Sequence, residues 1–251
     1  MSDSLKITVV GATGQIGAKV VELLTAAGHD VVATSRASGV DVLTGDGLDD
    51  ALAGAQVLVD VTNSPSFEDG PVMEFFTASS ANLVAAAKRA GVGHYVALSI
   101  VGADGLPKSG YMRAKVVQEN AIVGSGLPYT IVRATQFHEF AEMITASLTV
   151  DGEVHAPDAR IQPIAAADVS AVVARVAAEP PVNGFLDIGG PDKMSFADLA
   201  RAVLAKEGSQ TPVVIDSGAT YFGTPVDATS LVTGDGAELA PTHLADWLAA
   251  R

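Results

Sequence analysis

The chain has 251 residues, with 15 basic and 29 acidic side chains, no cysteine and a formal net charge of −14 at pH 7. We expect one domain, or one domain with a small appendage, able to bury about 70–75% of the surface of its unfolded chain. The lack of cysteine excludes disulfides, thiolate catalysis and cysteine-ligated metal sites. The acidic balance argues against nucleic-acid and anionic-membrane partners, because no basic stripe is present to bind phosphates.

The beginning of the chain does not read as a targeting segment. The sequence MSDSLKITVV lacks the basic region and the apolar length of a signal peptide, and no later stretch has about 18 uninterrupted apolar residues. We therefore expect a cytoplasmic protein without a membrane span.

Short β-branched runs alternate with amphipathic helical patterns in the first half of the chain. The predicted strands are residues 7–10, 31–34, 41–43, 57–61, 95–98 and 129–132. The predicted helices between them are residues 15–27, 48–53, 71–90 and 111–123. Alternation with short connections implies a doubly wound α/β fold, with a parallel sheet, right-handed crossovers and helices on both faces.

The pattern loosens after about residue 135. It predicts an extended segment at 150–154, strands at 184–188 and 212–215, and helices at 168–178 and 242–250. Ser195 and Asp198 form a variant of the capping box, which predicts a further helix to about residue 206.

A glycine-rich turn, GATGQIG, joins the first predicted strand to the first helix. Gly11 permits a tight turn, Gly14 lets a pyrophosphate approach the backbone, and Gly17 lets the helix pack against the sheet. The helix N-terminus offers N–H groups and the positive end of its dipole to phosphates. A plain strand–helix turn is the alternative. The predicted dinucleotide-binding residues here are Gly11, Thr13, Gly14, Gln15, Ile16 and Gly17.

The end of the second predicted strand distinguishes NAD from NADP. An acidic residue there would bind the 2′-hydroxyl of the adenine ribose, but this chain has Ser35 and Arg36. A guanidinium suits a 2′-phosphate through bidentate hydrogen bonds, so we expect NADP(H) as the cofactor. A solvated surface arginine is the alternative. Asp41 and Val42 are expected beside the adenine, although Asp41 equally suits a turn.

Four segments together resemble the NmrA-like, atypical short-chain dehydrogenase/reductase group: VVGATGQIGAKV, HYVALSIVGAD, YMRAK and GLPYTIVRATQF. The resemblance extends from residue 6 to about residue 205. It implies a Rossmann-type sheet that binds NADP(H) and a smaller C-terminal lobe on the substrate side. We therefore predict an NADP-binding core at residues 1–135, with residues 136–251 completing the sheet and forming this lobe in one compact unit.

The resemblance also carries individual roles. It implies that Ser99 is the active-site serine and that Tyr111 and Lys115 are the Y-x-x-x-K pair. Asn82 lies on the long helix where the larger enzyme group often has a structural asparagine. Further cofactor contacts are implied beside the adenosine and ribose, at Thr62 and Asn63, and near the nicotinamide, at Ala134, Thr135 and Phe137.

These residue types suit carbonyl reduction, which needs a hydride donor and a proton donor. A tyrosine hydroxyl has a pKa of about 10, and a lysine one helical turn away is expected to lower it toward the working range. The i, i+4 spacing places Tyr111 and Lys115 on one helix face. Lys115 would also hold the nicotinamide ribose, and Ser99 would donate to the developing oxyanion. A Y-x-x-x-K that arises by chance is the alternative.

The leading hypothesis is an NADPH-dependent oxidoreductase that reduces a small carbonyl, quinone or activated alkene. A regulator that senses NADP(H) without catalysis is the main alternative. An epimerase or dehydratase would require a larger sugar-nucleotide lobe than the C-terminal residues provide. Folds of this kind and size often dimerise, so a homodimer remains open.

Other catalytic patterns are absent from the sequence. The acidic and histidine residues beyond the sixth predicted strand lack the spacing of a metal site, so we expect none. Ser99 lies in LSIVG rather than in the G-x-S-x-G of a hydrolase. His138 is predicted either to face a substrate pocket or to lie on a helix surface.

Overall fold

The computed structural model describes residues 4–251, and the chain divides into two compact units built from separate segments. Unit 1 runs to Ser99 and also contains Gly110–Arg133 and Val169–Leu186. Unit 2 contains Ile100–Ser109, Ala134–Asp168 and Asp187–Arg251. The predicted division at residue 135 stays a prediction; residues 169–186, which it assigns to the C-terminal part, lie in unit 1.

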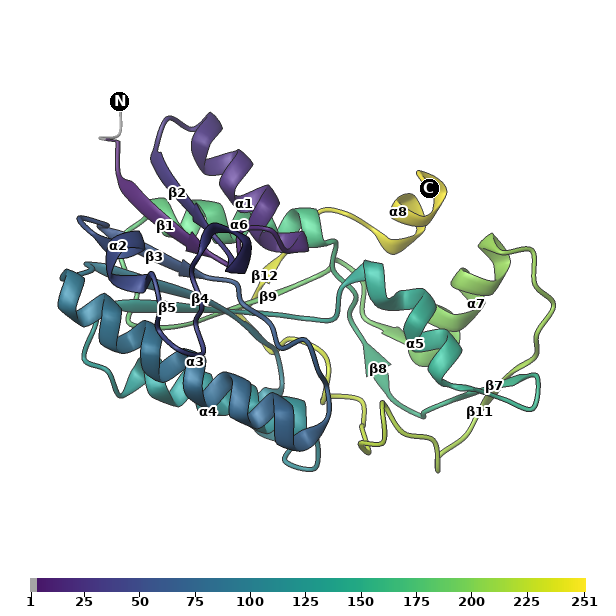
Figure 1. Ribbon diagram of the computed structural model, residues 1–251. Helices are drawn as coiled ribbons and strands as arrows, with labels where there is room; N and C mark the ends of the chain where they lie inside the picture. The colour runs from purple at the N-terminus through teal and green to yellow at the C-terminus, as the bar shows by residue number, and fades with distance from the viewer. Residues whose placement is uncertain (1–3) are drawn as a thin grey trace. The chain divides into compact units, whose positions relative to one another are not determined.

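The strands of unit 1 form the predicted sheet (Figure 1). They are β1 (Lys6–Val10), β2 (Asp30–Thr34), β3 (Val57–Asp60), β4 (His94–Ile100), β5 (Tyr129–Ala134) and β9 (Gly184–Gly189), the last three of which end in unit 2. The order of the seven-stranded sheet is β12-β9-β5-β4-β3-β1-β2, where β12 (Glu238–Leu239) pairs in parallel with the last two residues of β9. Since β1 lies between β2 and β3 in parallel register, the chain reverses direction across the sheet at β1, as in Rossmann-type folds.

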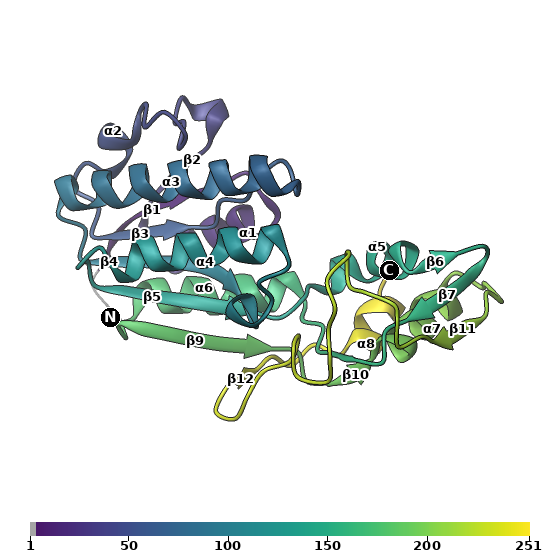
Figure 2. The ribbon, with the colours of Figure 1, turned by 90° about the horizontal axis from the view of Figure 1, so that it is seen from below.

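Helices cover both faces of this sheet, which confirms the doubly wound fold. Figures 1 and 2 show α1 (Gln15–Ala26) and α6 (Ala166–Ala178) on one face, and α3 (Asp69–Ala90) beside α4 (Gly110–Val123) on the other. The short helix α2 (Leu48–Leu52) packs on α3. Four consecutive residues of β1 and all four of β3 are buried, which explains their continuous apolar runs.

The predicted strand at 41–43 is wrong. The Asp41 carboxylate accepts a hydrogen bond from the Leu43 N–H at 2.8 Å, and the Gly45 N–H donates to the Asp41 carbonyl at 2.8 Å. These local bonds close a turn and compete with strand pairing. Asp41 therefore behaves as the turn residue that the sequence also allowed.

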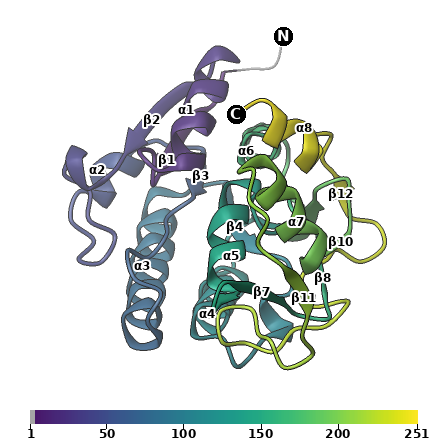
Figure 3. The same ribbon diagram turned by 90° about the vertical axis from the view of Figure 1, so that its right-hand side faces the viewer.

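Unit 2 is a smaller mixed assembly (Figure 3). Its helices are α5 (Ala141–Ser147), α7 (Phe196–Lys206) and α8 (Leu244–Ala249), and its short strands are β6 (Thr149–Val150), β7 (Glu153–Ala156), β8 (Arg160–Ile161), β10 (Met194–Ser195) and β11 (Val213–Ile215). The extended segment predicted at 150–154 is a hairpin of β6 and β7, turning at Asp151 and Gly152 with φ of 50° and 82°. The capping prediction is confirmed, because the Ser195 hydroxyl accepts from the Asp198 N–H at 3.0 Å.

Within residues 4–251, no helix combines the length and the apolar character that crossing a membrane would require.

The tight packing of the first turn predicts opposite effects of alanine at two glycines. A Cβ atom at Gly17 would lie 2.1 Å from the Gly11 carbonyl oxygen, whereas one at Gly70 in α3 would meet nothing within 4 Å. We expect Gly17→Ala to lower the free energy of unfolding by about 1–3 kcal/mol, and Gly70→Ala to raise it by up to about 1 kcal/mol. Urea denaturation measures both; destabilisation of the same size in both variants would contradict this account.

Candidate functional site

The glycine turn between β1 and α1 is packed against the backbone of two neighbouring strands. Gly11 has φ of +88°, and a Cβ there would lie 2.8 Å from the Val61 carbonyl oxygen. The N–H groups of Gly11 and Ala12 donate to the Thr34 carbonyl at 3.2 and 3.0 Å. Both the tight turn and the close approach therefore require glycine at position 11, as predicted.

The N-terminus of α1 is left without a capping side chain. Gly14 is its N-cap residue, no side chain among residues 4–251 caps it, and no acidic residue lies in its first turn. Thr13, Gly14 and Gln15 are exposed. A twelve-residue helix thus presents unpaired N–H groups and the positive end of its dipole to solvent. This arrangement fits the pyrophosphate of a dinucleotide.

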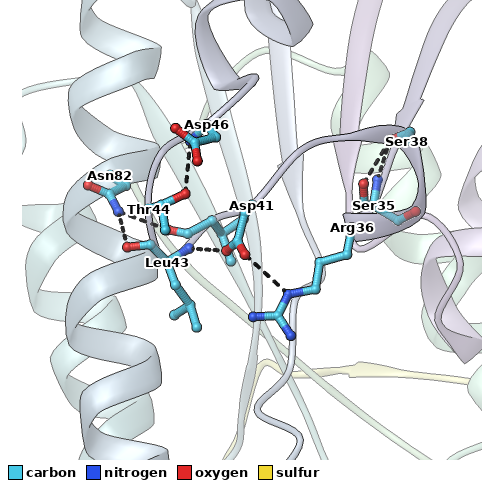
Figure 4. A network of polar contacts seen from close by, with 9 residues as sticks. Ser35, Arg36, Ser38, Asp41, Leu43, Thr44, Asp46 and Asn82 are labelled. Carbon is cyan, nitrogen blue, oxygen red and sulfur yellow. Dashed lines mark hydrogen bonds and ion pairs between the residues drawn. The ribbon is translucent and has the colours of Figure 1, made fainter.

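Arg36 lies just beyond β2, in the short 3₁₀ helix η1 (Arg36–Ser38) (Figure 4). Its side chain is 69% exposed, and its Nε atom is 3.4 Å from a carboxylate oxygen of Asp41. The Ser38 hydroxyl holds the turn by binding the N–H and the carbonyl of Ser35 at 2.9 and 2.8 Å. An exposed ion pair of this length is weak, so the guanidinium can exchange Asp41 for another anion at little cost.

Asn82 of α3 fixes the loop that follows Arg36. Its side-chain N–H₂ group donates to the carbonyls of Val42 and Leu43, each at 2.9 Å (Figure 4). Asn82 therefore has a structural role here, and the target of its hydrogen bonds is the loop 41–43.

The segment after β3 contacts α4. The Asn63 side-chain oxygen accepts the Tyr111 hydroxyl at 2.8 Å and the Ser64 N–H at 2.9 Å. The N–H and hydroxyl of Thr62 both donate to Asp60, at 3.1 and 2.7 Å. The contacts of Thr62 and Asn63 with the adenosine and ribose, which the resemblance implies, stay a prediction. The resemblance did not indicate the hydrogen bond between Asn63 and Tyr111.

Tyr111 lies among aromatic rings at the start of α4. Its ring centroid is 5.3 Å from that of Phe67 and 6.1 Å from that of Phe76. Burial raises the pKa of the Tyr111 hydroxyl to about 12, and the hydrogen bond with Asn63 opposes this only in part. In the protein alone this pKa therefore lies above its usual value and not in the working range, and the ammonium of Lys115 is bound to other acceptors.

Lys115 is only 3% exposed. Its ammonium donates to the Leu98 carbonyl at 2.8 Å and to the Gln118 side-chain oxygen, and it lies 4.5 Å from the centroid of the Phe76 ring. Burial lowers the pKa of Lys115 to about 8, although the charges of Asp60 and Glu119 oppose the shift.

Ser99 follows Leu98 near the end of β4 and is 3% exposed. Among the residues that the structure describes, its hydroxyl has no hydrogen-bond partner. A buried hydroxyl without a partner is costly, which favours a ligand or water as its partner in the functioning protein. Because Lys115 binds the adjacent Leu98 carbonyl and the Phe76 ring lies against both Lys115 and Tyr111, unit 1 brings the three predicted catalytic residues into one region.

The three residues predicted near the nicotinamide, Ala134, Thr135 and Phe137, belong to unit 2. The Thr135 N–H donates to the Ile188 carbonyl at 3.1 Å, and Phe137 stacks on Phe140 with centroids 5.5 Å apart. Their contact with a cofactor stays a prediction.

His138 begins the 3₁₀ helix η3 (His138–Phe140) and is 1% exposed. Its ring packs edge-on against Trp247 at 5.5 Å, and burial lowers its pKa. The prediction of a helix-surface histidine is therefore wrong, while its alternative place in a substrate pocket stays a prediction. Residues 4–251 contain no group of three side chains suited to hold a metal ion.

Sequence comparison points to a nucleotide-binding family. The profile of a family described as NAD(P)H-binding matches residues 11–180. An NAD(P)H azoreductase of Xenophilus azovorans is 30% identical over 221 residues, which is 80% of this chain and 74% of that protein.

Solved structures share the fold. The NADPH-dependent quinone oxidoreductase QOR2 of Escherichia coli, solved with NADPH, has a TM-score of 0.69 and 22% identity, with 97% of this chain and 99% of that chain covered. A UDP-N-acetylglucosamine 4-epimerase of Bacillus cereus has a TM-score of 0.71 and 18% identity, with 98% and 96% covered. This chain covers nearly all of that structure, so the size of its C-terminal part alone does not distinguish the two.

The loop contact of Asn82 predicts a measurable loss of stability. Asn82→Ala removes two hydrogen bonds and leaves the Val42 and Leu43 carbonyls without them, so we expect the free energy of unfolding to fall by about 1–3 kcal/mol. Asn120→Ala, at an exposed position of α4, is the matched control and should change it by less than about 0.5 kcal/mol. Urea denaturation tests this, and equal values for the two variants would refute the role of Asn82.

Proposed function

The chain belongs to the NAD(P)H-binding family, and on that premise we propose that it is an NADPH-dependent oxidoreductase of the short-chain type. It would reduce a small carbonyl, quinone or activated alkene. The observation that carries the proposal is the unpartnered, buried hydroxyl of Ser99 beside the Leu98 carbonyl that Lys115 holds, with Tyr111 one helical turn before Lys115.

The residues of unit 1 suit the proton transfer and the charge stabilisation that this chemistry requires. A bound dinucleotide would supply the hydride. Tyr111 would supply the proton: with a pKa near 12 it is fully protonated at neutral pH, and an alkoxide is a strong enough base to take its proton. Ser99 would donate its free O–H to the developing negative oxygen. The charge of Lys115 would stabilise the phenolate that remains on Tyr111.

Two features support binding of the phosphorylated dinucleotide. The uncapped N-terminus of α1, with Thr13, Gly14, Gln15 and Ile16, would hold the pyrophosphate. Arg36, exposed and weakly paired with Asp41, would turn to the 2′-phosphate of NADPH. Asp41 could instead accept the 2′-hydroxyl of NADH, so the choice between the two dinucleotides depends on these two side chains.

The relatives support the substrate class. Reduction of an azo compound or a quinone, as named for the azoreductase and for QOR2, delivers a hydride and a proton to a planar conjugated molecule. The exposed ring of Phe67, next to Tyr111, would offer such a molecule an aromatic face.

A protein that binds NADP(H) without turnover is the second candidate. It is favoured by the state of Lys115, whose ammonium is bound to Leu98 and Gln118 in the protein alone.

Substitution of Tyr111 tests the proposed mechanism. With a panel of carbonyls, quinones and azo compounds, we expect Tyr111→Phe to lower kcat for NADPH oxidation by at least about 100-fold, because the proton donor is lost. The Kd for NADPH should change little. Tyr129→Phe, in β5, is the matched control and should retain activity. Unchanged kcat in Tyr111→Phe would refute the mechanism. Wild-type protein that binds NADPH but oxidises none of it would favour the non-catalytic candidate, or an epimerase if a UDP-sugar is converted.

Substitution of Arg36 tests the cofactor preference. Loss of the charge-assisted bonds to the 2′-phosphate should raise the Kd for NADPH by about 10- to 100-fold in Arg36→Ala and leave the Kd for NADH within about twofold. Arg89→Ala removes a similarly exposed arginine that pairs with Asp49 and serves as the control. Fluorescence titration measures all six values, for the wild type and the two variants with each dinucleotide. Equal weakening of both dinucleotides in Arg36→Ala would rule out a 2′-phosphate contact.

A further inference from the structure

A line of buried polar groups joins the end of β3 to Lys115 in unit 1. Asp60, Gln118 and Lys115 are 1%, 1% and 3% exposed. The Gln118 side-chain N–H₂ group donates to Asp60 at 2.8 Å, and its oxygen accepts the ammonium of Lys115. None of the sequence motifs includes Asp60 or Gln118.

Asp60 is held rigidly. One carboxylate oxygen accepts the N–H and the hydroxyl of Thr62, and the other accepts the Tyr95 hydroxyl at 3.0 Å together with Gln118. Four donors around one buried carboxyl group fix its orientation. The buried carboxylate of Asp60 therefore has a fixed position next to Gln118 of α4.

Gln118 can adopt only one orientation between its two neighbours. Its N–H₂ group must face the carboxylate, which only accepts, and its oxygen must face the ammonium, which only donates. The reversed amide would leave two oxygens in contact on one side and two donors on the other. Gln118 thus connects the negative charge of Asp60 to the positive charge of Lys115, and it does not titrate.

The other groups that face Lys115 do not supply this function. Glu119, on the same helix, is engaged by the guanidinium of Arg133 through two bonds of 2.8 and 2.6 Å. Phe76 of α3 contributes the face of its ring, and Leu98 of β4 a carbonyl. Tyr95 donates to Asp60, and its pKa is raised well above the usual value by burial and by that carboxylate. Asp60 is therefore the countercharge of Lys115.

We propose that Gln118 and Asp60 are positioning residues for Lys115: the Gln118 amide ties the lysine to a fixed carboxylate, which keeps its ammonium charged and aimed at the end of β4 beside Ser99. The value of this arrangement to the reaction rests on the proposed function, in which Lys115 acts at the dinucleotide and at Tyr111. The arrangement itself is a property of the protein alone and can be tested without turnover.

The test is the titration of Lys115 in the protein without dinucleotide, followed by NMR of ¹³C-labelled lysine, with Lys115→Arg identifying the signal. Gln118→Leu removes a hydrogen bond to the charged form, so the pKa of Lys115 should fall from its value near 8 by about one pH unit. Gln118→Glu places a carboxylate against the ammonium, so the same pKa should rise by about one unit or more. Gln56→Leu, which removes an exposed side-chain amide from unit 1, should leave it unchanged.

Opposite shifts in the two Gln118 variants would support the proposal, because a merely structural disturbance has no reason to change sign. No shift, or shifts in the same direction, would overturn it. Should Gln118→Leu fail to fold, Gln118→Met, which keeps the length of the side chain and lacks its polar groups, takes its place, and a pKa of Lys115 that does not fall refutes the link.

Dinucleotide binding separates this inference from the proposed function. Between pH 7 and 9.5 the 2′-phosphate of NADPH stays doubly charged, so its Kd should rise as Lys115 loses its proton, about one pH unit earlier in Gln118→Leu. If the lysine titration shifts as expected but the Kd for NADPH does not follow, the positioning role stands and the action of Lys115 at the dinucleotide is rejected.

Discussion

The close contact between backbone atoms at the first turn is the constraint on which the proposed site depends. The Gly11 and Ala12 N–H groups bind the Thr34 carbonyl, and Gly11 lies against the Val61 carbonyl with no space for a Cβ atom. These contacts tie the turn before α1 to the ends of both neighbouring strands, β2 and β3. These backbone contacts consequently fix the starting points of three parts of the proposed site: the N-terminus of α1, Arg36 after β2 and Asn63 after β3.

The parts of the fold that depend on local pattern follow directly from the sequence. The runs at β1 and β3 are buried on both faces, and Gly11 and Gly17 have the steric roles expected of them. The segment 41–43 does not follow, because an apolar pair beside an aspartate fits a strand as well as a turn. Only the bonds of Asp41 to Leu43 and of Gly45 to Asp41 decide between them.

Contacts between distant segments explain what the sequence leaves open at the site. Tyr111 and Lys115 are one turn apart on α4, yet their hydroxyl and ammonium bind different partners, Asn63 and Gln118. The direction of a long side chain depends on which acceptors surround it, and here Leu98 comes from β4 while Asp60 acts through Gln118 from β3. Spacing predicts that two residues share a helix face and does not predict which neighbours their polar atoms bind.

The turn and the arginine contribute to recognition in different ways. The pyrophosphate would be bound by backbone N–H groups, which do not depend on the identity of a side chain. They lie in a turn where a Cβ atom at Gly11 or Gly17 does not fit. Arg36 lies at the surface on a short 3₁₀ helix, and neither η1 nor the weak pair with Asp41 contributes to the core. Its replacement costs the fold little. If Arg36 binds the 2′-phosphate as proposed, a substitution at this exposed position would change the preference between the two nicotinamide dinucleotides, while the binding of their pyrophosphate stays unchanged.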